Sequence, residues 1–255
     1  DFRVNQANFY LDAMSAGVNY GVIQQAGSWY TVHGDNGEPV LKAFGKSAFL
    51  TALSEDAAEK SAKGDMKGVK MRIGGMAGLI LAKLGVVPQQ LGAPDIYPAL
   101  EKGTIDAAEW VGPYDDEKLG FNKVASFYYY PGWWEACSMY SMYVNTKEWE
   151  KLPKVYQNAL EVACYEANLD MMAEYDFKNP LALARLLKNG VKLHAYSTQI
   201  MKEAQKQAFD LYEEESGKNP AFKKIYEPWK KFRREQFQWN RVAEHTLSNF
   251  MLNNM

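Results

Sequence analysis

Hydrophobic and polar positions follow two different periods along the first half of the chain. Short β-branched and aromatic runs have the pattern of strands, and segments with leucine and alanine at helical spacing have the pattern of helices. The pattern predicts strands at 17–23, 29–32, 69–73 and 105–110, and helices at 46–62, 76–84 and 94–102. This alternation is typical of a layered α/β fold, in which ligands bind at strand ends.

The second half of the chain has mainly the helical period. Its pattern predicts a helix at 155–175, a strand at 191–196, a helix at 200–215 and a long amphipathic helix within 222–250. We therefore expect an α/β lobe that is followed by long C-terminal helices.

Composition and charge narrow the class of protein. The 255 residues are 47% apolar, and 29 basic against 31 acidic residues give a net charge of −2. This balance offers no basic field for nucleic acid or an anionic membrane. Every apolar run is far shorter than the roughly 18–20 residues that span a bilayer. The chain shows no initiator methionine or secretion signal at its start, which fits a processed or truncated chain.

Sequence motifs for catalysis are scarce. The three histidines are far apart and form no zinc-binding pair, and no GxSxG motif occurs. The glycine-rich stretch 74–78 matches neither of the common nucleotide-binding patterns. Cys137 and Cys164 are too few for a cysteine-rich scaffold, and they either form a disulfide in an oxidising compartment or stay as buried thiols.

A candidate anion site follows the strand predicted at 69–73. Arg72 lies at the end of this strand, just before a glycine pair and the start of a helix. A guanidinium in this place could bind a carboxylate through two hydrogen bonds, with help from exposed backbone N–H groups. The default interpretation of a lone arginine is a surface side chain that pairs with a neighbouring acid.

Carboxylates and aromatic rings follow two other predicted strands. Glu109 and Trp110 come before a Gly-Pro loop, and an aromatic run at 128–134 ends at Glu135. Two carboxylates and several rings at strand ends suggest a small enclosed polar site. The alternative is that the two tryptophans of this run belong to the core.

Three blocks of this sequence closely resemble one family. They are KMRIGG at 70–75, the segment 94–113 that ends in AEWVGP, and YYPGWWE at 129–135. At this spacing they resemble the DctP-type periplasmic solute receptors of TRAP transporters, and within them the branch that binds 2-oxo acids and other small monocarboxylates with a metal ion. The resemblance extends from about residue 18 to the carboxyl end and implies a periplasmic-binding-protein-like fold.

The resemblance also implies roles for single positions. Arg72 corresponds to the arginine that binds the substrate carboxylate. The implied substrate-binding set is Arg72, Gln25, Trp110, Glu109, Glu135 and Trp134. The implied metal ligands are the side chains of Gln25, Glu109 and Glu135 and the backbone carbonyl of Trp110, with Gln24 as the alternative register for the glutamine.

Charge balance agrees with these implied roles. Oxygen ligands of this kind suit Na⁺ or Ca²⁺ rather than zinc. Burial of Glu109 and Glu135 without a cation would be costly, because unpaired buried charges are strongly unfavourable. Arg72 would then balance the bound acid. No bond need be made or broken, so the resemblance predicts a binding protein and no enzyme.

The family pattern predicts how the chain divides into regions, and the chain departs from that pattern in two ways. Residues 1–16 would be a remnant of an amino-terminal lobe or a lead-in helix, 17–145 the α/β ligand-binding lobe, and 146–255 a helical, hinge-spanning region. Family members carry a further lobe of roughly 100 residues before this point, so that lobe is expected to be missing or truncated. The segment 32–63 is longer than usual, and we expect it to be an insertion that forms a helical hairpin or a dimer surface.

Three functions are compatible with these features. The first is a periplasmic receptor that delivers a small carboxylate to the membrane subunits of a TRAP permease, with a homodimer through the C-terminal helix as in some family members. The second is an α/β enzyme acting on a 2-oxo acid with Glu109 or Glu135 as general base. The third is an interaction module that uses the basic stretch 230–234.

Overall fold

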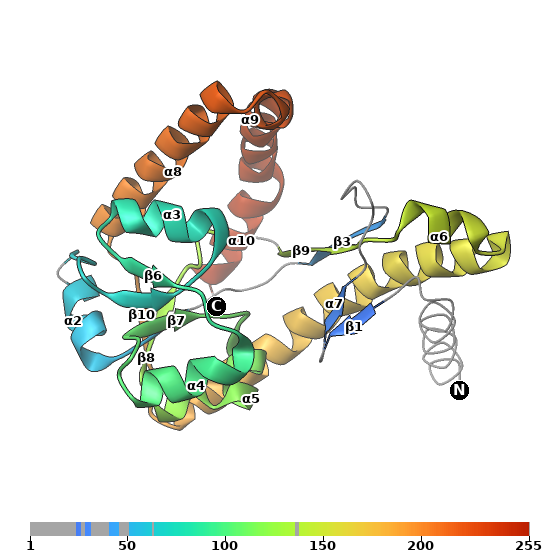
Figure 1. Ribbon diagram of the computed structural model, residues 1–255. Coiled ribbons are helices and arrows are strands. Elements are labelled where there is room, and N and C mark those ends of the chain that lie inside the picture. Colours follow the sequence, from blue (N-terminus) through green and yellow to red (C-terminus); the bar gives the residue numbers. More distant parts are fainter. Residues whose placement is uncertain are drawn as a thin grey trace.

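The structure is a computed structural model of the chain, and it describes residues 24–26, 29–31, 41–45, 51–62, 64–135 and 138–254. Its centre is a six-stranded mixed sheet (Figure 1). In spatial order the strands are β10 (Lys192–Ala195), β8 (Phe127–Tyr130), β4 (Thr51–Leu53), β7 (Ala107–Glu109), β5 (Lys70–Arg72) and β6 (Val87–Gln89). Strand β4 runs antiparallel to β7 and β8, and the other pairings are parallel.

Alternation along the strands divides the core between the two faces of the sheet. Successive residues point to opposite faces, so Leu53 and Tyr129 pack in one hydrophobic cluster while Ala52 and Tyr128 pack in the other. Residues of α2 (Glu55–Ala62), α3 (Gly75–Lys83) and α8 (Thr198–Lys218) complete the first cluster. Residues of α4 (Ala93–Glu101) and the C-terminal end of α7 (Lys154–Lys188) complete the second. The sheet is therefore a buried middle layer between two layers of helices.

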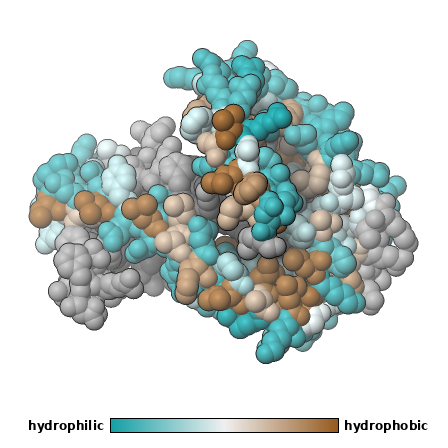
Figure 2. Space-filling model, turned by 180° about the vertical axis from the view of Figure 1, so that it is seen from behind, coloured by the Kyte–Doolittle hydropathy of each residue, from teal (hydrophilic) through white to brown (hydrophobic). Residues whose placement is uncertain are grey.

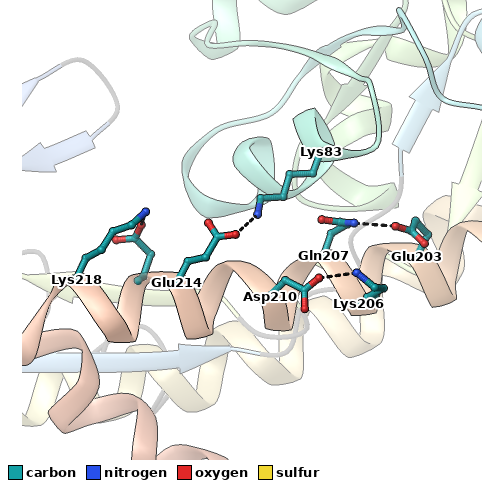
Figure 3. Close-up of polar contacts among 8 residues, drawn as sticks. Lys83, Glu203, Lys206, Gln207, Asp210, Glu214 and Lys218 are labelled. Atoms are coloured by element: carbon teal, nitrogen blue, oxygen red, sulfur yellow. Dashed lines mark hydrogen bonds and ion pairs between the residues drawn. The ribbon is translucent and has the colours of Figure 1, made fainter.

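An exposed polar contact joins α3 and α8, which cover the first face of the sheet. Lys83, in the last turn of α3, donates a hydrogen bond to Glu214 of α8 at 2.9 Å. Figure 3 shows this bond beside pairs that stay within α8, such as Lys206 with Asp210. These contacts are exposed, so each contributes little to stability.

The long helix α7 connects the central sheet with a second region. It packs against α5 (Pro113–Leu119) beside the central sheet and also against β3 (Leu41–Gly45). Strand β3 pairs with β9 (Ser138–Met142) in a separate two-stranded sheet. A further pair is formed by β1 (Gln24–Ala26) and β2 (Trp29–Thr31). With 35 residues, α7 is about 50 Å long and spans both regions (Figure 1).

The C-terminal part of the chain is helical. After β9 come α6 (Thr146–Lys151) and α7, and after α8 come α9 (Pro220–Asn240), a π-helical turn (Arg241–His245) and α10 (Thr246–Leu252). The expected α/β fold with long C-terminal helices is confirmed. Across the described ranges, every helix is too short or too polar to cross a membrane.

Two predicted elements differ from the structure. Residues 51–53, expected within a helix at 46–62, form strand β4, and the helix begins only at Glu55. The helix expected at 155–175 continues to Lys188, through Pro180. Its last turns are held by tertiary packing, since Ala182 and Leu186 are buried. The strand expected at 17–23 lies outside the described residues.

Part of the segment 32–63 belongs to the core of the protein. Strand β4 lies in the middle of the sheet, and Ala57 and Ala58 of α2 are 1% and 3% exposed. Residues 51–62 are therefore needed for the central sheet and for one of its helical covers. The expected helical hairpin is not formed by these residues.

Candidate functional site

The candidate site lies at one edge of the central sheet. Strands β5, β7 and β8 run in the same direction, because β5 is parallel to β7 and both β7 and β8 are antiparallel to β4. Their carboxyl ends therefore meet at the same edge. Arg72 ends β5, Glu109 ends β7, and the loop after β8 carries Trp134 and Glu135.

Arg72 and Glu109 bind each other directly. Nη1 of Arg72 donates a hydrogen bond to the backbone oxygen of Glu109 at 2.9 Å and forms an ion pair with Oε1 of the same residue. The two side chains are 18% and 9% exposed. The default interpretation of Arg72 as half of an ion pair is thus correct, but the pair lies in a largely buried place.

Two further contacts fix the guanidinium of Arg72. Its Nε donates to the backbone oxygen of Leu91 at 3.2 Å, and its Cζ lies 4.8 Å from the ring centroid of Trp110. Leu91 follows β6, the strand next to β5. The carbonyl of Leu91 was missed from the sequence, because no side-chain chemistry marks a backbone acceptor.

The carboxyl of Glu109 is in an unusual electrostatic environment. Burial raises its pKa to about 7, the positive charge of Arg72 lowers it, and the negative charge of Glu135 raises it. Glu109 is 7% exposed, whereas Glu135 is exposed. Two carboxylates that repel each other at the edge of a sheet are suited to share a bound cation.

Trp134 presents a hydrogen-bond donor at this site. Its Nε1 is buried and has no partner of hydrogen-bond geometry among the described residues, yet it lies close enough to Glu109 to lower the pKa of that carboxyl. The ring contacts Trp133 and Tyr196 edge-on, with centroid distances of 5.3 and 6.2 Å. An indole N–H can only donate, so this group suits an oxygen of an anionic ligand rather than a cation.

The donor set fits a hard cation only with further oxygen ligands. No group of three His, Cys, Asp or Glu side chains that could hold a metal ion occurs in the part of the chain that the structure describes. Glu109 and Glu135 would therefore need backbone or amide oxygens to complete a coordination shell. The backbone of Gln25 lies in β1, paired with Tyr30, but its side chain lies outside the described residues, as does that of Gln24.

The structure thus brings together five of the six predicted site residues. Arg72, Glu109, Trp110, Trp134 and Glu135 lie around the same edge of the sheet. Their ligand-binding roles stay predictions.

The chain matches the family model of the bacterial extracellular solute-binding proteins, family 7 (DctP), over residues 35–218. It belongs to this family. The match covers both the central sheet and the long helix α7.

Individual members of the family support the comparison. A monocarboxylate 2-oxoacid-binding periplasmic protein from Nostoc sp. is 54% identical over 186 residues, which are 73% of this chain and 51% of the relative. A TRAP transporter solute-binding protein from Bordetella bronchiseptica is 48% identical, with a TM-score of 0.77 over 84% of this chain and 63% of that one. It was solved as a dimer with calcium and picolinate in one active site.

A second protein of known structure, from Pseudoalteromonas atlantica, contains sodium and pyruvate. It is 31% identical, with a TM-score of 0.71 over 83% of this chain and 63% of that one. The chain therefore spans about half of the curated relative and under two thirds of these solved structures. The two solved structures are TRAP solute-binding proteins and the curated relative is named as a binding protein, so the enzyme hypothesis finds no support among them.

Proposed function

We propose that this chain is the ligand-binding part of a periplasmic TRAP receptor. It binds a small carboxylate, such as pyruvate, another 2-oxo acid or lactate, together with Ca²⁺ or Na⁺, and delivers the acid to the membrane permease. The observation that carries the proposal is the convergence of Arg72, Glu109 and the buried N–H of Trp134 at one sheet edge. The ligands of the similar proteins support the same class of acid.

Each group of the site takes one role in this proposal. The guanidinium of Arg72 binds the substrate carboxylate through charge-assisted hydrogen bonds. Glu109, Glu135, the backbone carbonyl of Trp110 and the side chain of Gln25 hold the cation. The N–H of Trp134 donates to a substrate oxygen, and its ring excludes water from the site.

The charges balance when acid and cation bind together. A bound cation would offset the repulsion between Glu109 and Glu135, which adds to the effect of burial in raising the pKa of Glu109. A 2-oxo acid would offer its carboxylate and keto oxygens to the same cation. Exclusion of water strengthens each of these interactions. The chain then needs only to bind and release its ligand.

In the proposed division of the chain at 1–16, 17–145 and 146–255, helix α7 is the hinge-spanning part of the last segment. Helix α7 contacts α5 at the central sheet and β3 in the second region. Its exposed apolar residues include Val155, Val162, Tyr165, Leu169, Phe177 and Leu181, and Figure 2 shows brown residues in a line along this helix. We infer that the further length present in the relatives covers this surface and closes over the ligand.

The long helix α9, near the carboxyl end of the chain, is proposed as the contact of a homodimer. It exposes Phe232, Phe237 and Trp239 at 58%, 63% and 62%. The dimer found for the Bordetella bronchiseptica protein supports an assembly of this kind. Light scattering after gel filtration should give a dimer mass for the wild type and a monomer mass for Phe232→Ser/Phe237→Ser. A monomeric wild type would refute the dimer and leave the ligand site unaffected.

A fluorescence titration tests the ligand proposal. Pyruvate and lactate are added to the protein with Ca²⁺, with Na⁺ and with chelator, while tryptophan emission and loss of the acid are followed in parallel. We expect a saturable change in emission that requires a cation, because Trp134 and Trp110 lie at the site. Consumption of the acid would instead support an enzyme.

A further inference from the structure

Arg72 and the proposed cation site share one carboxylate. Nη1 of Arg72 binds Oε1 of Glu109, which is the side chain proposed as a cation ligand. This side chain is largely buried, so water can replace a lost partner only poorly. A cation that binds Glu109 therefore competes with the guanidinium for the same negative charge.

The guanidinium has supports that do not depend on this carboxylate. Nε donates to the carbonyl of Leu91, and the ring of Trp110 lies under the guanidinium. Among the described residues, the structure records no hydrogen-bond partner for Nη2. If the carboxylate of Glu109 turned to a cation, Nη1 of Arg72 would keep its bond to the backbone oxygen of Glu109. The other N–H of Nη1 would then be available together with Nη2, and such a pair of donors is what a carboxylate accepts.

We propose that Arg72 exchanges partners when the site is loaded: the cation takes the carboxylate of Glu109, and the released guanidinium takes the carboxylate of the substrate. This inference rests on the function proposed above, and it adds that cation binding regulates binding of the acid. The site binds its acid well only after a cation has displaced Arg72 from Glu109. In the unloaded site, the ion pair with Arg72 balances the charge of Glu109.

The exchange makes the two binding events cooperative. Whatever factor the cation adds to the affinity for the acid, the acid must add to the affinity for the cation. A coupling of roughly 5- to 150-fold is typical between two sites. A chelating acid would also produce cooperativity without any exchange, so cooperativity alone does not test the proposal.

Cation binding in the absence of any acid does test it. The probe is Ca²⁺ alone, titrated by calorimetry into chelator-treated protein at pH 9. The high pH matters, because loss of Arg72 removes an interaction that lowers the pKa of Glu109, and a proton would otherwise take the place of the guanidinium. The variants are Arg72→Gln and Arg72→Met, so that one substitute remains if the other fails to fold. Arg185→Gln is the matched control, since Arg185 pairs with Glu117 on the surface of α5 and α7.

If the guanidinium and the cation compete for Glu109, removal of the guanidinium should raise the affinity for the cation. Ca²⁺ should bind Arg72→Gln and Arg72→Met about tenfold more tightly than the wild type, within the usual range of site couplings, and Arg185→Gln should match the wild type. Equal or weaker binding by the folded Arg72 variants, with measurable binding by the wild type, would overturn the exchange and leave the receptor proposal intact. Failure of every protein to bind Ca²⁺, repeated with Na⁺, would overturn both.

Discussion

Asp116 is expected to make the stability of the folded protein depend strongly on pH. Its side chain is buried and accepts a hydrogen bond from the hydroxyl of Tyr128. Burial raises the pKa of this carboxyl from 3.8 to about 8, against the lowering effect of the Tyr128 hydrogen bond. The folded protein therefore holds a proton at neutral pH that the unfolded chain releases.

The sign and size of the effect follow from this difference in proton binding. When folding raises the pKa of a group, its contribution to the free energy of unfolding is complete at pH values below its pKa in the unfolded chain. This contribution is lost as the pH rises towards its pKa in the folded protein. Between pH 5 and 7 the folded form keeps the proton and the unfolded form does not. One proton corresponds to 1.36 kcal/mol per pH unit, so the loss over these two units is about 2.7 kcal/mol.

Urea unfolding at pH 5 and pH 7 measures this loss. The substitution Asp116→Asn removes the titrating group but keeps an oxygen that can accept from Tyr128. From pH 5 to 7 the wild type should lose about 2.7 kcal/mol more of its free energy of unfolding than Asp116→Asn does. Asp210→Asn is the control, because Asp210 lies on the exposed surface of α8, paired with Lys206 (Figure 3). It should behave as the wild type does.

Equal pH dependence of the wild type and Asp116→Asn would refute the reasoning. It would mean that Asp116 is ionised in the folded protein, either because water reaches it or because an unrecognised partner offsets its charge.

Three other substitutions test the site and the core. Arg72→Ala should weaken pyruvate binding by roughly 30-fold or more, since loss of one partner of a buried charge pair costs about 2–5 kcal/mol; calorimetry with excess Ca²⁺ measures this, and unchanged affinity would contradict the role of Arg72. Glu135→Gln should weaken pyruvate binding in Ca²⁺ but leave any residual binding in chelator unchanged, and equal loss in both conditions would count against coordination. Leu53→Ala should lower the free energy of unfolding by about 2–5 kcal/mol, because Leu53 is 0% exposed in the central strand β4; a loss below 1 kcal/mol in urea would show that β4 is not part of the core.

The sequence predicted that these residues lie near each other, because the ends of strands are easy to recognise in it. Arg72 and Glu109 each end a short strand, and the parallel order of β5 and β7 brings the two ends together. The direct ion pair between them was not predicted, since the family pattern assigns one to the substrate and the other to the cation. Sequence spacing does not show which of two compatible partners a charged group contacts.

Short strands, and helix ends that depend on tertiary contacts, were harder to predict. Strand β4 has only three residues, and two of them are alanine and leucine, which favour helices. The segment forms a strand because it pairs with β7 and β8. Helix α7 passes Pro180, a residue that normally ends a helix. Its continuation depends on distant contacts, such as the hydrogen bond from the backbone N–H of Tyr114 to Asn179 at 3.1 Å.

A crystal structure from crystals grown with Ca²⁺ and pyruvate tests most directly the claim that the site binds an acid together with a cation. Anomalous scattering identifies the cation, and the density identifies the acid. The account predicts Ca²⁺ against the carboxylates of Glu109 and Glu135, with pyruvate between the cation and the guanidinium of Arg72. Pyruvate bound elsewhere, or Arg72 still paired with Glu109 beside a bound acid and no cation, would contradict it.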